Sequence, residues 1–367
     1  MKFTVSRDAL IKPLQQAAGV VERRHTLPVL ANVLLVLEND QLSLTGTDLE
    51  VEMIGIVAVD PGSVAGEITV PARKLMDICK SLPENAQLQF SLEDDKATIK
   101  AGRSRFTLAT LPARDFPNTE DEPGTFELGI DGKQLKRLLD SCSFAMAQQD
   151  VRYYLNGMLF EVTDQHLRVV ATDGHRLAMQ TLSLENAISQ DLQLIFPRKA
   201  VTELSRLLTD VDGEVTLVFG SNLVRARMRD FVFTSKLVEG KFPDYNRVLP
   251  KGSDKTVTAD RLILKQAFNR ASILSNEKYR GVKILLSTDE MQILANNPEQ
   301  EEAEEIISAS YQGEPLEIGF NVSYLLDVLN VLDCEQVKIS LADSNSSALL
   351  EGVSDDDAVY VVMPMRL

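Results

Sequence analysis

The chain has 367 residues, of which 44% are hydrophobic and 25% charged, and its net charge is −16. These values are typical of a globular protein of two or three domains, and no apolar run is long enough for a transmembrane helix. The N-terminal stretch is charged throughout, unlike a signal peptide. The three cysteines, at Cys79, Cys142 and Cys334, lack the spacing of a metal site. We therefore expect a cytoplasmic protein with buried, reduced thiols.

One series of elements occurs three times along the chain. A hairpin pattern comes first, and its turns are spaced by 124 and 125 residues, at Asp40, Asp164 and Asp289. A helical pattern follows each hairpin, beginning at Val70, Phe196 and Phe320. A β-rich stretch closes each series, at 105–112, 231–240 and 359–367. Solenoid repeats are only about 20–50 residues long, so this repeat predicts three whole domains, at 1–122, 123–250 and 251–367.

Each domain is expected to contain two amphipathic helices among strands with Asn-Asp and Thr-Asp turns, without βαβ alternation. The predicted fold class is therefore α+β, with two helices per domain packed on antiparallel sheets. The expected helices cover residues 7–18, 72–81, 132–144, 198–209, 260–275 and 321–333.

Basic charge is concentrated on these helices, although the whole chain is acidic. They contain 14 Lys and Arg but seven Asp and Glu, which gives +7 on the helices and −23 elsewhere. Solvated helix faces are often basic, but an excess on five of the six helices favours one shared basic surface that contacts phosphates.

A quasi-repeating chain with six helices can close into a ring. Packed helix axes lie about 8–10 Å apart, so six helices would leave almost no hole, whereas twelve from two chains would form a circle about 34 Å across. Subtracting a helix diameter of about 10 Å leaves a hole of about 24 Å, enough for a B-DNA duplex about 20 Å wide. Basic helices inside such a ring would contact phosphates without reading bases and would permit sliding.

The sequence has no P-loop, dinucleotide-binding, zinc-protease or serine-hydrolase motif. The catalytic alternative is a hydrolase that uses Asp173 and His175, but neither residue has a nucleophile or metal-ligand partner at a matching spacing. Asp173 also aligns with Asp48 and Asn297 of the other repeats, which favours a structural role. The absent nucleophile argues against an enzyme, and we expect no metal and no cofactor.

Motifs along the whole chain resemble those of one family, the bacterial DNA polymerase III β sliding clamps. They include MKFTV at 1–5, LTGTDLE at 44–50, QDVRYYLNGMLFE at 149–161, ATDGHRLA at 171–178 and YVVMPMRL at 360–367. The resemblance implies a head-to-tail dimeric ring of three similar domains per chain, which encircles duplex DNA, slides on it and confers processivity. It also implies partners that bind through short motifs: the DNA polymerase III catalytic subunit, a clamp loader, other polymerases, mismatch repair proteins and ligase.

The resemblance further implies a peptide-binding cleft between the second and third domains. Its residues would be Leu155, Thr172, Gly174, His175, Arg176, Leu177, Pro243, Arg247, Val248, Val361, Met363, Pro364, Met365 and Arg366. Met and aliphatic side chains form an adaptable pocket for short apolar anchors, so several partners could compete for this cleft.

Two further surfaces follow from the same resemblance. DNA would be contacted by Arg24, Arg73, Gln149, Tyr153, Tyr154, Arg198 and Lys199. The apolar centre of the ring joint would consist of Phe106, Ile273 and Leu274. Around it, Lys74, Arg103 and Arg105 would face Glu299, Glu301, Glu302, Glu304 and Glu305 of the other copy.

A ring or adaptor that does not bind DNA is the remaining alternative. It predicts that charge reversal at Arg73, Arg198 and Lys199 leaves DNA retention unchanged.

Overall fold

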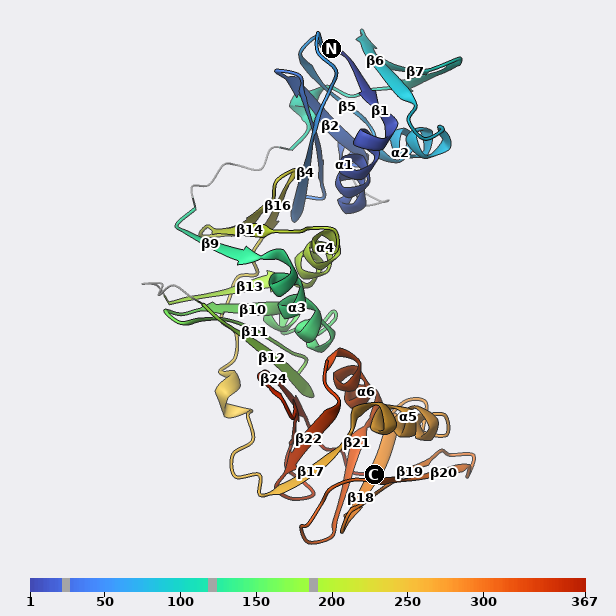
Figure 1. Ribbon diagram of the computed structural model, residues 1–367. Helices are drawn as coiled ribbons and strands as arrows, with labels where there is room; N and C mark the ends of the chain where they lie inside the picture. The colour runs from blue at the N-terminus through green and yellow to red at the C-terminus, as the bar shows by residue number, and fades with distance from the viewer. Residues whose placement is uncertain (22–26, 118–123, 185–190) are drawn as a thin grey trace. The chain divides into compact units, whose positions relative to one another are not determined.

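The computed structural model describes residues 1–21, 27–117, 124–184 and 191–367 (Figure 1). The chain folds as two compact units, one made of residues 1–135 with 202–237 and the other of 136–201 with 238–367. Among the described residues, no helix is long and apolar enough to cross a membrane.

The first unit contains an eight-stranded antiparallel sheet. Its strands, in spatial order, are β5 (Gly66–Pro71), β2 (Asn32–Glu38), β3 (Gln41–Thr47), β4 (Val51–Ala58), β16 (Phe231–Lys236), β15 (Leu223–Arg227), β14 (Glu214–Phe219) and β9 (Phe126–Asp131). A four-stranded sheet accompanies it, in the order β1 (Lys2–Ser6), β6 (Gln87–Glu93), β7 (Lys96–Ala101) and β8 (Ser104–Ala109). The pairing of β4 with β16 joins strands of the first repeat to strands of the second in one continuous sheet.

The second unit repeats this arrangement. Its eight-stranded sheet has the order β13 (Leu192–Pro197), β10 (Gly157–Val162), β11 (His166–Thr172), β12 (Arg176–Ser183), β24 (Asp355–Val362), β23 (Ala348–Gly352), β22 (Gln336–Leu341) and β17 (Lys255–Asp260). Its four-stranded sheet has the order β20 (Glu302–Ser308), β19 (Glu290–Asn296), β18 (Gly281–Ser287) and β21 (Leu316–Asn321). Here the pairing of β12 with β24 joins the second repeat to the third.

Six α-helices lie in the described part of the chain, at the positions that the sequence predicts. They are α1 (Arg7–Val20), α2 (Ala72–Ser81), α3 (Gly132–Cys142), α4 (Arg198–Leu208), α5 (Arg261–Ser272) and α6 (Val322–Val331). Ser6 caps α1 by accepting a hydrogen bond from the Ala9 amide, and Asp260 caps α5 by accepting one from the Ile263 amide. Because α1 packs on α2 and α5 packs on α6, the first and third repeats each have a helix pair beside their sheets. The expected α+β class is confirmed.

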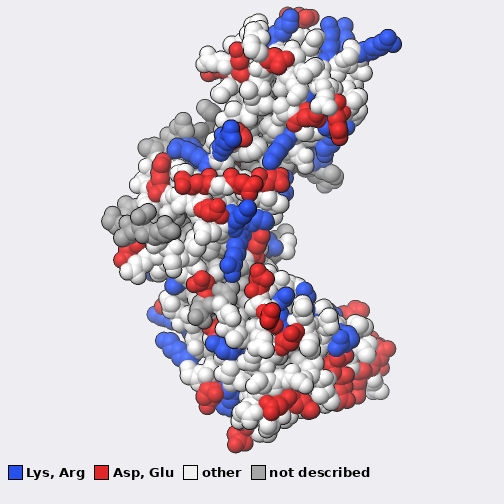
Figure 2. All heavy atoms as spheres, viewed as in Figure 1, with Lys and Arg blue, Asp and Glu red and all other residues white. Residues whose placement is uncertain are grey.

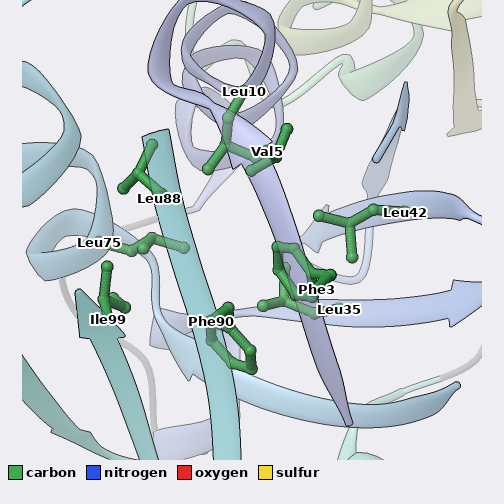
Figure 3. A pocket seen from close by; sticks show the side chains of 9 residues that line it. All are labelled: Phe3, Val5, Leu10, Leu35, Leu42, Leu75, Leu88, Phe90 and Ile99. Atoms are coloured by element: carbon green, nitrogen blue, oxygen red, sulfur yellow. The ribbon is translucent and has the colours of Figure 1, made fainter. Parts of the chain in front are cut away.

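The core of the first unit lies where α1 and α2 meet β1, β2 and β6. Its apolar side chains surround a cavity of about 10 Å³ (Figure 3), lined by Phe3, Val5, Leu10, Leu35, Leu42, Leu75, Leu88, Phe90 and Ile99. A space this small with only apolar walls is a packing gap rather than a ligand site. The helix α1 approaches β3 so closely that a Cβ at Gly46 would overlap the Ala17 carbonyl oxygen.

Two of the three turn residues that mark the repeat share a backbone conformation. Asp40 and Asp289 adopt positive φ angles of 56° and 54° in the turns that follow β2 and β18, a conformation that Asp tolerates better than most residues. Asp164 lies between β10 and β11.

The prediction that all three cysteines are buried is only partly right, because Cys79 and Cys142 are buried but Cys334 is half-buried.

Candidate protein-binding cleft and charged surfaces

Three residues of the predicted cleft, Leu155, Leu177 and Val361, form an apolar floor in the second unit. They are at most 2% exposed and belong to one hydrophobic cluster together with Phe242 and Tyr245. Leu177 of β12 and Val361 of β24 are directly paired across the two strands. Leu155 ends the short 3-10 helix Tyr153–Leu155, so the floor combines a helical residue with two strand residues that are more than 180 positions apart in the sequence.

The segment 238–250, which carries three of the predicted cleft residues, is anchored by two aromatic residues. Phe242 and Tyr245 are buried. The Tyr245 hydroxyl donates a hydrogen bond to Glu161 Oε1 at 2.7 Å and accepts one from Arg168 Nη1 at 3.0 Å. Pro243, between these anchors, and Arg247 and Val248, just after them, are exposed.

The C-terminal segment (residues 363–367) lies beside the same floor. The Met363 amide donates to the His175 carbonyl oxygen at 2.9 Å, and the Met365 amide donates to the Gly319 carbonyl oxygen at 2.9 Å. Met363 is 43% exposed, Pro364 and Met365 are half-buried, and Arg366 is exposed. A flexible thioether is therefore presented to solvent next to an apolar floor, the combination that suits short apolar anchors.

The turn between β11 and β12 (residues 172–176) carries four of the predicted cleft residues. Asp173 Oδ1 accepts hydrogen bonds from the His175 amide at 2.8 Å and the Arg176 amide at 3.0 Å. Gly174 has a φ of +89°, a conformation in which glycine is favoured. Thr172 Oγ1 donates to the Arg176 carbonyl oxygen at 2.6 Å.

The structural role that the sequence indicates for Asp173 is confirmed. Asp48 Oδ1 accepts from the Glu50 and Val51 amides, and Asn297 Oδ1 accepts from the Glu301 amide. All three aligned residues thus cap a turn through the same side-chain oxygen. His175 stacks on Tyr324 with ring centroids 6.4 Å apart, so its ring is in contact with an aromatic ring of α6 rather than with a nucleophile.

The predicted DNA-contacting residues lie on both units. Arg73 is exposed on α2 of the first unit, and Arg24 lies outside the described residues. In the second unit, Gln149 is exposed with a φ of +55°. Tyr153 is 56% exposed, whereas the neighbouring Tyr154 is half-buried against the core. The Arg198 guanidinium donates to the Met146 carbonyl oxygen at 2.9 Å, and Lys199 is half-buried beside it at the start of α4.

The loop that carries Gln149 and Tyr153 is held by a network of hydrogen bonds. Arg152 donates from Nε and Nη2 to the two carboxylate oxygens of Asp150, at 3.0 and 2.8 Å. The side-chain bonds from Arg152, followed by the bond from its amide, lower the pKa of Asp150 to about 2. Asn156 adds a pair of bonds, donating to the Asp150 carbonyl oxygen and accepting from the Asp150 amide.

The residues predicted at the ring joint are exposed or half-buried on the two units. Ile273 is 75% exposed at the end of α5, and Leu274 and Phe106 are half-buried. Lys74, Arg103 and Arg105 are exposed on the first unit. Acidic side chains gather over β19 and β20 in the second unit (Figure 2), including Glu302, Glu304 and Glu305 of β20.

The structure qualifies one part of this prediction. Glu305 forms a two-fold ion pair with Arg270 of α5, with distances of 2.8 and 2.6 Å, and this pair lowers the pKa of Glu305. Glu304 accepts a hydrogen bond from Gln292, and Glu301 accepts one from Asn297. These three acids therefore have partners within their own chain, besides any role in a joint.

Around the predicted cleft residue Arg176, the structure brings together residues that the sequence did not indicate. Arg176 contacts Phe144, Tyr324 and Asp327, and none of these three was predicted to belong to the site. Asp327 is the one charged residue in helix α6, and this was a signal that could have drawn attention to it.

No cluster of three or more His, Cys, Asp or Glu side chains that could hold a metal ion occurs within the described ranges.

A polar hollow of about 570 Å³ lies in the second unit, lined by Arg137, Asp333, Cys334, Glu335, Gln336, Val353, Ser354 and Asp357. Its acids outnumber its single arginine, so it does not form a phosphate-binding pocket.

Family models match three consecutive parts of this chain. The N-terminal domain of the DNA polymerase III beta subunit matches residues 1–120, its central domain matches 129–244 and its C-terminal domain matches 246–366. Three tandem domains of this kind, each with two helices on antiparallel sheets, define a sliding clamp, a class of processivity factors that are not enzymes.

Full-length relatives agree with this class, and the chain belongs to the DNA polymerase III beta subunit family. It is 61% identical to the beta sliding clamp of Pseudomonas aeruginosa and 53% identical to that of Escherichia coli K12, in each case over 100% of both chains. A crystal structure of the Pseudomonas aeruginosa subunit superposes with a TM-score of 0.98 over 100% of both chains, at 61% identity. The Caulobacter crescentus subunit gives 0.95 at 39% identity, again over 100% of both. Another Pseudomonas aeruginosa structure, also at 61% identity, holds the clamp bound to griselimycin.

Proposed function

We propose that two copies of this chain close head to tail into a ring that encircles duplex DNA in the cytoplasm. The ring slides on the duplex and tethers the DNA polymerase III catalytic subunit to it. Each copy contributes three domains, at residues 1–122, 123–250 and 251–367. A clamp loader places the ring on DNA, and other polymerases, mismatch repair proteins and ligase use the same attachment site.

The observation that carries the proposal is a buried apolar cluster beside an exposed methionine in the second unit. Leu155, Leu177 and Val361 supply a buried apolar floor, and Met363 is exposed beside it. A short peptide with apolar anchors could pack those anchors against this floor. Such a site recognises a type of anchor rather than one protein, as an attachment point shared by several partners requires.

The distribution of charge supports the DNA-binding part of the proposal. Each of the helices α1 to α5 carries more Lys and Arg than Asp and Glu, although the chain has a net charge of −16. Contacts between such helices and phosphates are independent of base sequence, so they allow the ring to move along DNA. Exposed Tyr153, beside Gln149, is suited to stacking on an unpaired base near a primer end.

The joint between copies would combine an apolar centre with a charged rim. Ile273 and Leu274 of one copy would pack on Phe106 of the other, and Arg103 and Arg105 would face the acidic edge of β19 and β20. Apolar burial at the centre supplies most of the affinity in such an interface. The charged rim sets the orientation and accelerates association.

The proposal is tested by the fluorescence anisotropy of a labelled peptide that carries a QLxLF-type clamp-binding motif. We expect saturable binding to the wild-type chain and at least a tenfold loss of affinity when Met363→Ala and Met365→Ala are combined. The matched control is Leu262→Ala with Ile263→Ala, which removes two exposed apolar side chains from α5 and should bind normally. A folded wild-type chain that does not bind the peptide would contradict the proposed cleft.

A further inference from the structure

The guanidinium of Arg176 is almost wholly occupied by its own protein. Its Nε donates to Asp173 Oδ2 at 3.1 Å, its Nη2 donates to the Phe144 carbonyl oxygen at 2.7 Å, and its Nη1 donates to Asp327 Oδ2. The side chain is only 12% exposed. Little of it remains available for an ion pair with a bound partner.

Two aromatic rings complete the surroundings of Arg176. Its Cζ lies 5.1 Å from the centroid of the Phe144 ring and 4.5 Å from that of Tyr324, within the range of cation–π attraction. The Tyr324 ring also stacks on His175. Because Tyr324 and Asp327 are three residues apart on α6, they share one face of that helix, and this face meets the turn at residues 172–176.

These contacts form a continuous connection from α6 to the exposed methionine of the cleft. Asp327 bonds to Arg176, and Arg176 bonds through its side chain and its amide to Asp173. Asp173 also fixes the His175 amide, and the His175 carbonyl oxygen accepts the hydrogen bond from Met363. The position of Met363 beside the apolar floor therefore depends in part on Asp327, which is not among the predicted cleft residues.

We propose that Asp327 is a positioning residue for the cleft: it holds Arg176, which in turn fixes the 172–176 turn and the start of the C-terminal segment. This inference rests on the proposed function of the cleft. It assigns Arg176 a structural role within this chain, rather than an ion pair with an acidic side chain of a bound peptide. It follows that a clamp-binding peptide needs apolar anchors here but no acidic side chain opposite Arg176.

Peptide anisotropy with an Asp327→Asn variant tests the proposal. The amide has the shape of the carboxylate but lacks its charge, so Arg176 is held less firmly, and we expect affinity to fall about tenfold. The matched control is Asp333→Asn, which removes an exposed acid just beyond the end of α6 and should leave affinity unchanged. A double-mutant cycle with Arg176→Gln follows. In the Arg176→Gln background, Asp327→Asn should cause no further loss of peptide affinity, because Asp327 acts on the cleft only through Arg176.

Hydrogen exchange separates positioning from general loss of stability. In Asp327→Asn, the amides of His175, Arg176 and Met363 should exchange faster, whereas those of β18 and β21 should not change. Equal affinities of wild type and Asp327→Asn would overturn this inference and leave the proposed function intact. An additive loss in the double mutant would also overturn it, and so would faster exchange throughout the unit. No binding by the wild type would overturn both proposals.

Discussion

Gly319 of β21 lies directly against Met365 of the C-terminal segment. The Met365 amide donates a hydrogen bond to the Gly319 carbonyl oxygen at 2.9 Å. A Cβ at Gly319 would come within 2.6 Å of the Met365 carbonyl oxygen, closer than real Cβ contacts allow. The last residues of the chain are thus seated on a strand that has room for them only because position 319 has no side chain.

Substitution of Gly319 by Ala should therefore displace the C-terminal segment and reduce peptide binding. The clash is with backbone rather than with a mobile side chain, so Met365 and Met363 must shift, and we expect a loss of about tenfold in affinity. Leu367→Ala is the companion variant, because it trims the side chain that packs on Gly319 and Gly281 but keeps the backbone bond. It should have a smaller effect, and an unchanged affinity in Gly319→Ala would contradict the assigned seating.

A second close approach predicts a loss of stability in the first unit. Gly46→Ala would force β3 away from the Ala17 carbonyl oxygen of α1 and should lower the free energy of unfolding by about 3 kcal/mol. Urea unfolding followed by circular dichroism measures this difference. The control is Gly129→Ala, whose added methyl group meets only the mobile end of Glu214 at 3.1 Å. Equal losses in the two variants would argue against tight packing of α1 on β3.

Much of this fold could be predicted from the sequence, because hydrophobic periodicity and turn chemistry are local. The hairpin turns at Asp40 and Asp289 and the capping oxygen of Asp173 each depend on residues a few positions away, so they repeat visibly along the chain. The continuous sheets could not be predicted in this way. Nothing near Val51 or Leu177 indicates that their strands pair with Ser235 and Val361.

The site shows the same division between local and long-range features. Met363 and Val361 could be assigned from a short motif, because the family pattern includes that stretch. The contacts of Arg176 with Phe144, Tyr324 and Asp327 could not, because they join three segments that are distant in sequence. The partners of Glu305 and Glu304 were missed for the same reason, since Arg270 lies on α5 and Gln292 on β19.

The proposed joint predicts that Ile273→Ala combined with Leu274→Ala converts dimers to monomers. Ile273 is 75% exposed in the single chain, and loss of two apolar side chains from the centre of an interface costs about 2 kcal/mol or more. Light scattering at micromolar concentration gives the mass. The double variant Leu262→Ala with Ile263→Ala, on the other end of α5, is the control and should remain dimeric. A dimer mass for both variants would place the joint elsewhere.

The low pKa of Asp150 predicts how the stability of its loop depends on pH. The folded-state pKa of about 2 lies below the usual value of about 3.9. The stabilisation from the charged carboxylate is therefore complete above about pH 4 and is lost as the pH falls towards 2. Asp150→Asn should be less stable than wild type at neutral pH, and the difference in melting temperature should shrink below pH 4. A difference that does not change with pH would exclude this carboxylate as the cause.

The cysteines should differ in their reactivity. Burial raises the pKa of Cys79 to about 11 and that of Cys142 to about 12, and only a thiolate reacts readily with disulfide reagents. Half-buried Cys334 should therefore react first with Ellman's reagent at pH 8 in the native protein, in a phase equivalent to one thiol. Cys334→Ser should abolish that phase, and its persistence would show that another cysteine is accessible.

Retention on circular DNA tests the central claim, a closed ring around the duplex, most directly. The chain is placed on nicked circular DNA by a clamp loader, and the bound protein is separated from free protein by gel filtration in high salt. A topological ring remains on the intact circle and leaves when one restriction cut makes the DNA linear, because its hold does not depend on tight contacts. Equal retention on circular and linear DNA, or release from both, would contradict the account.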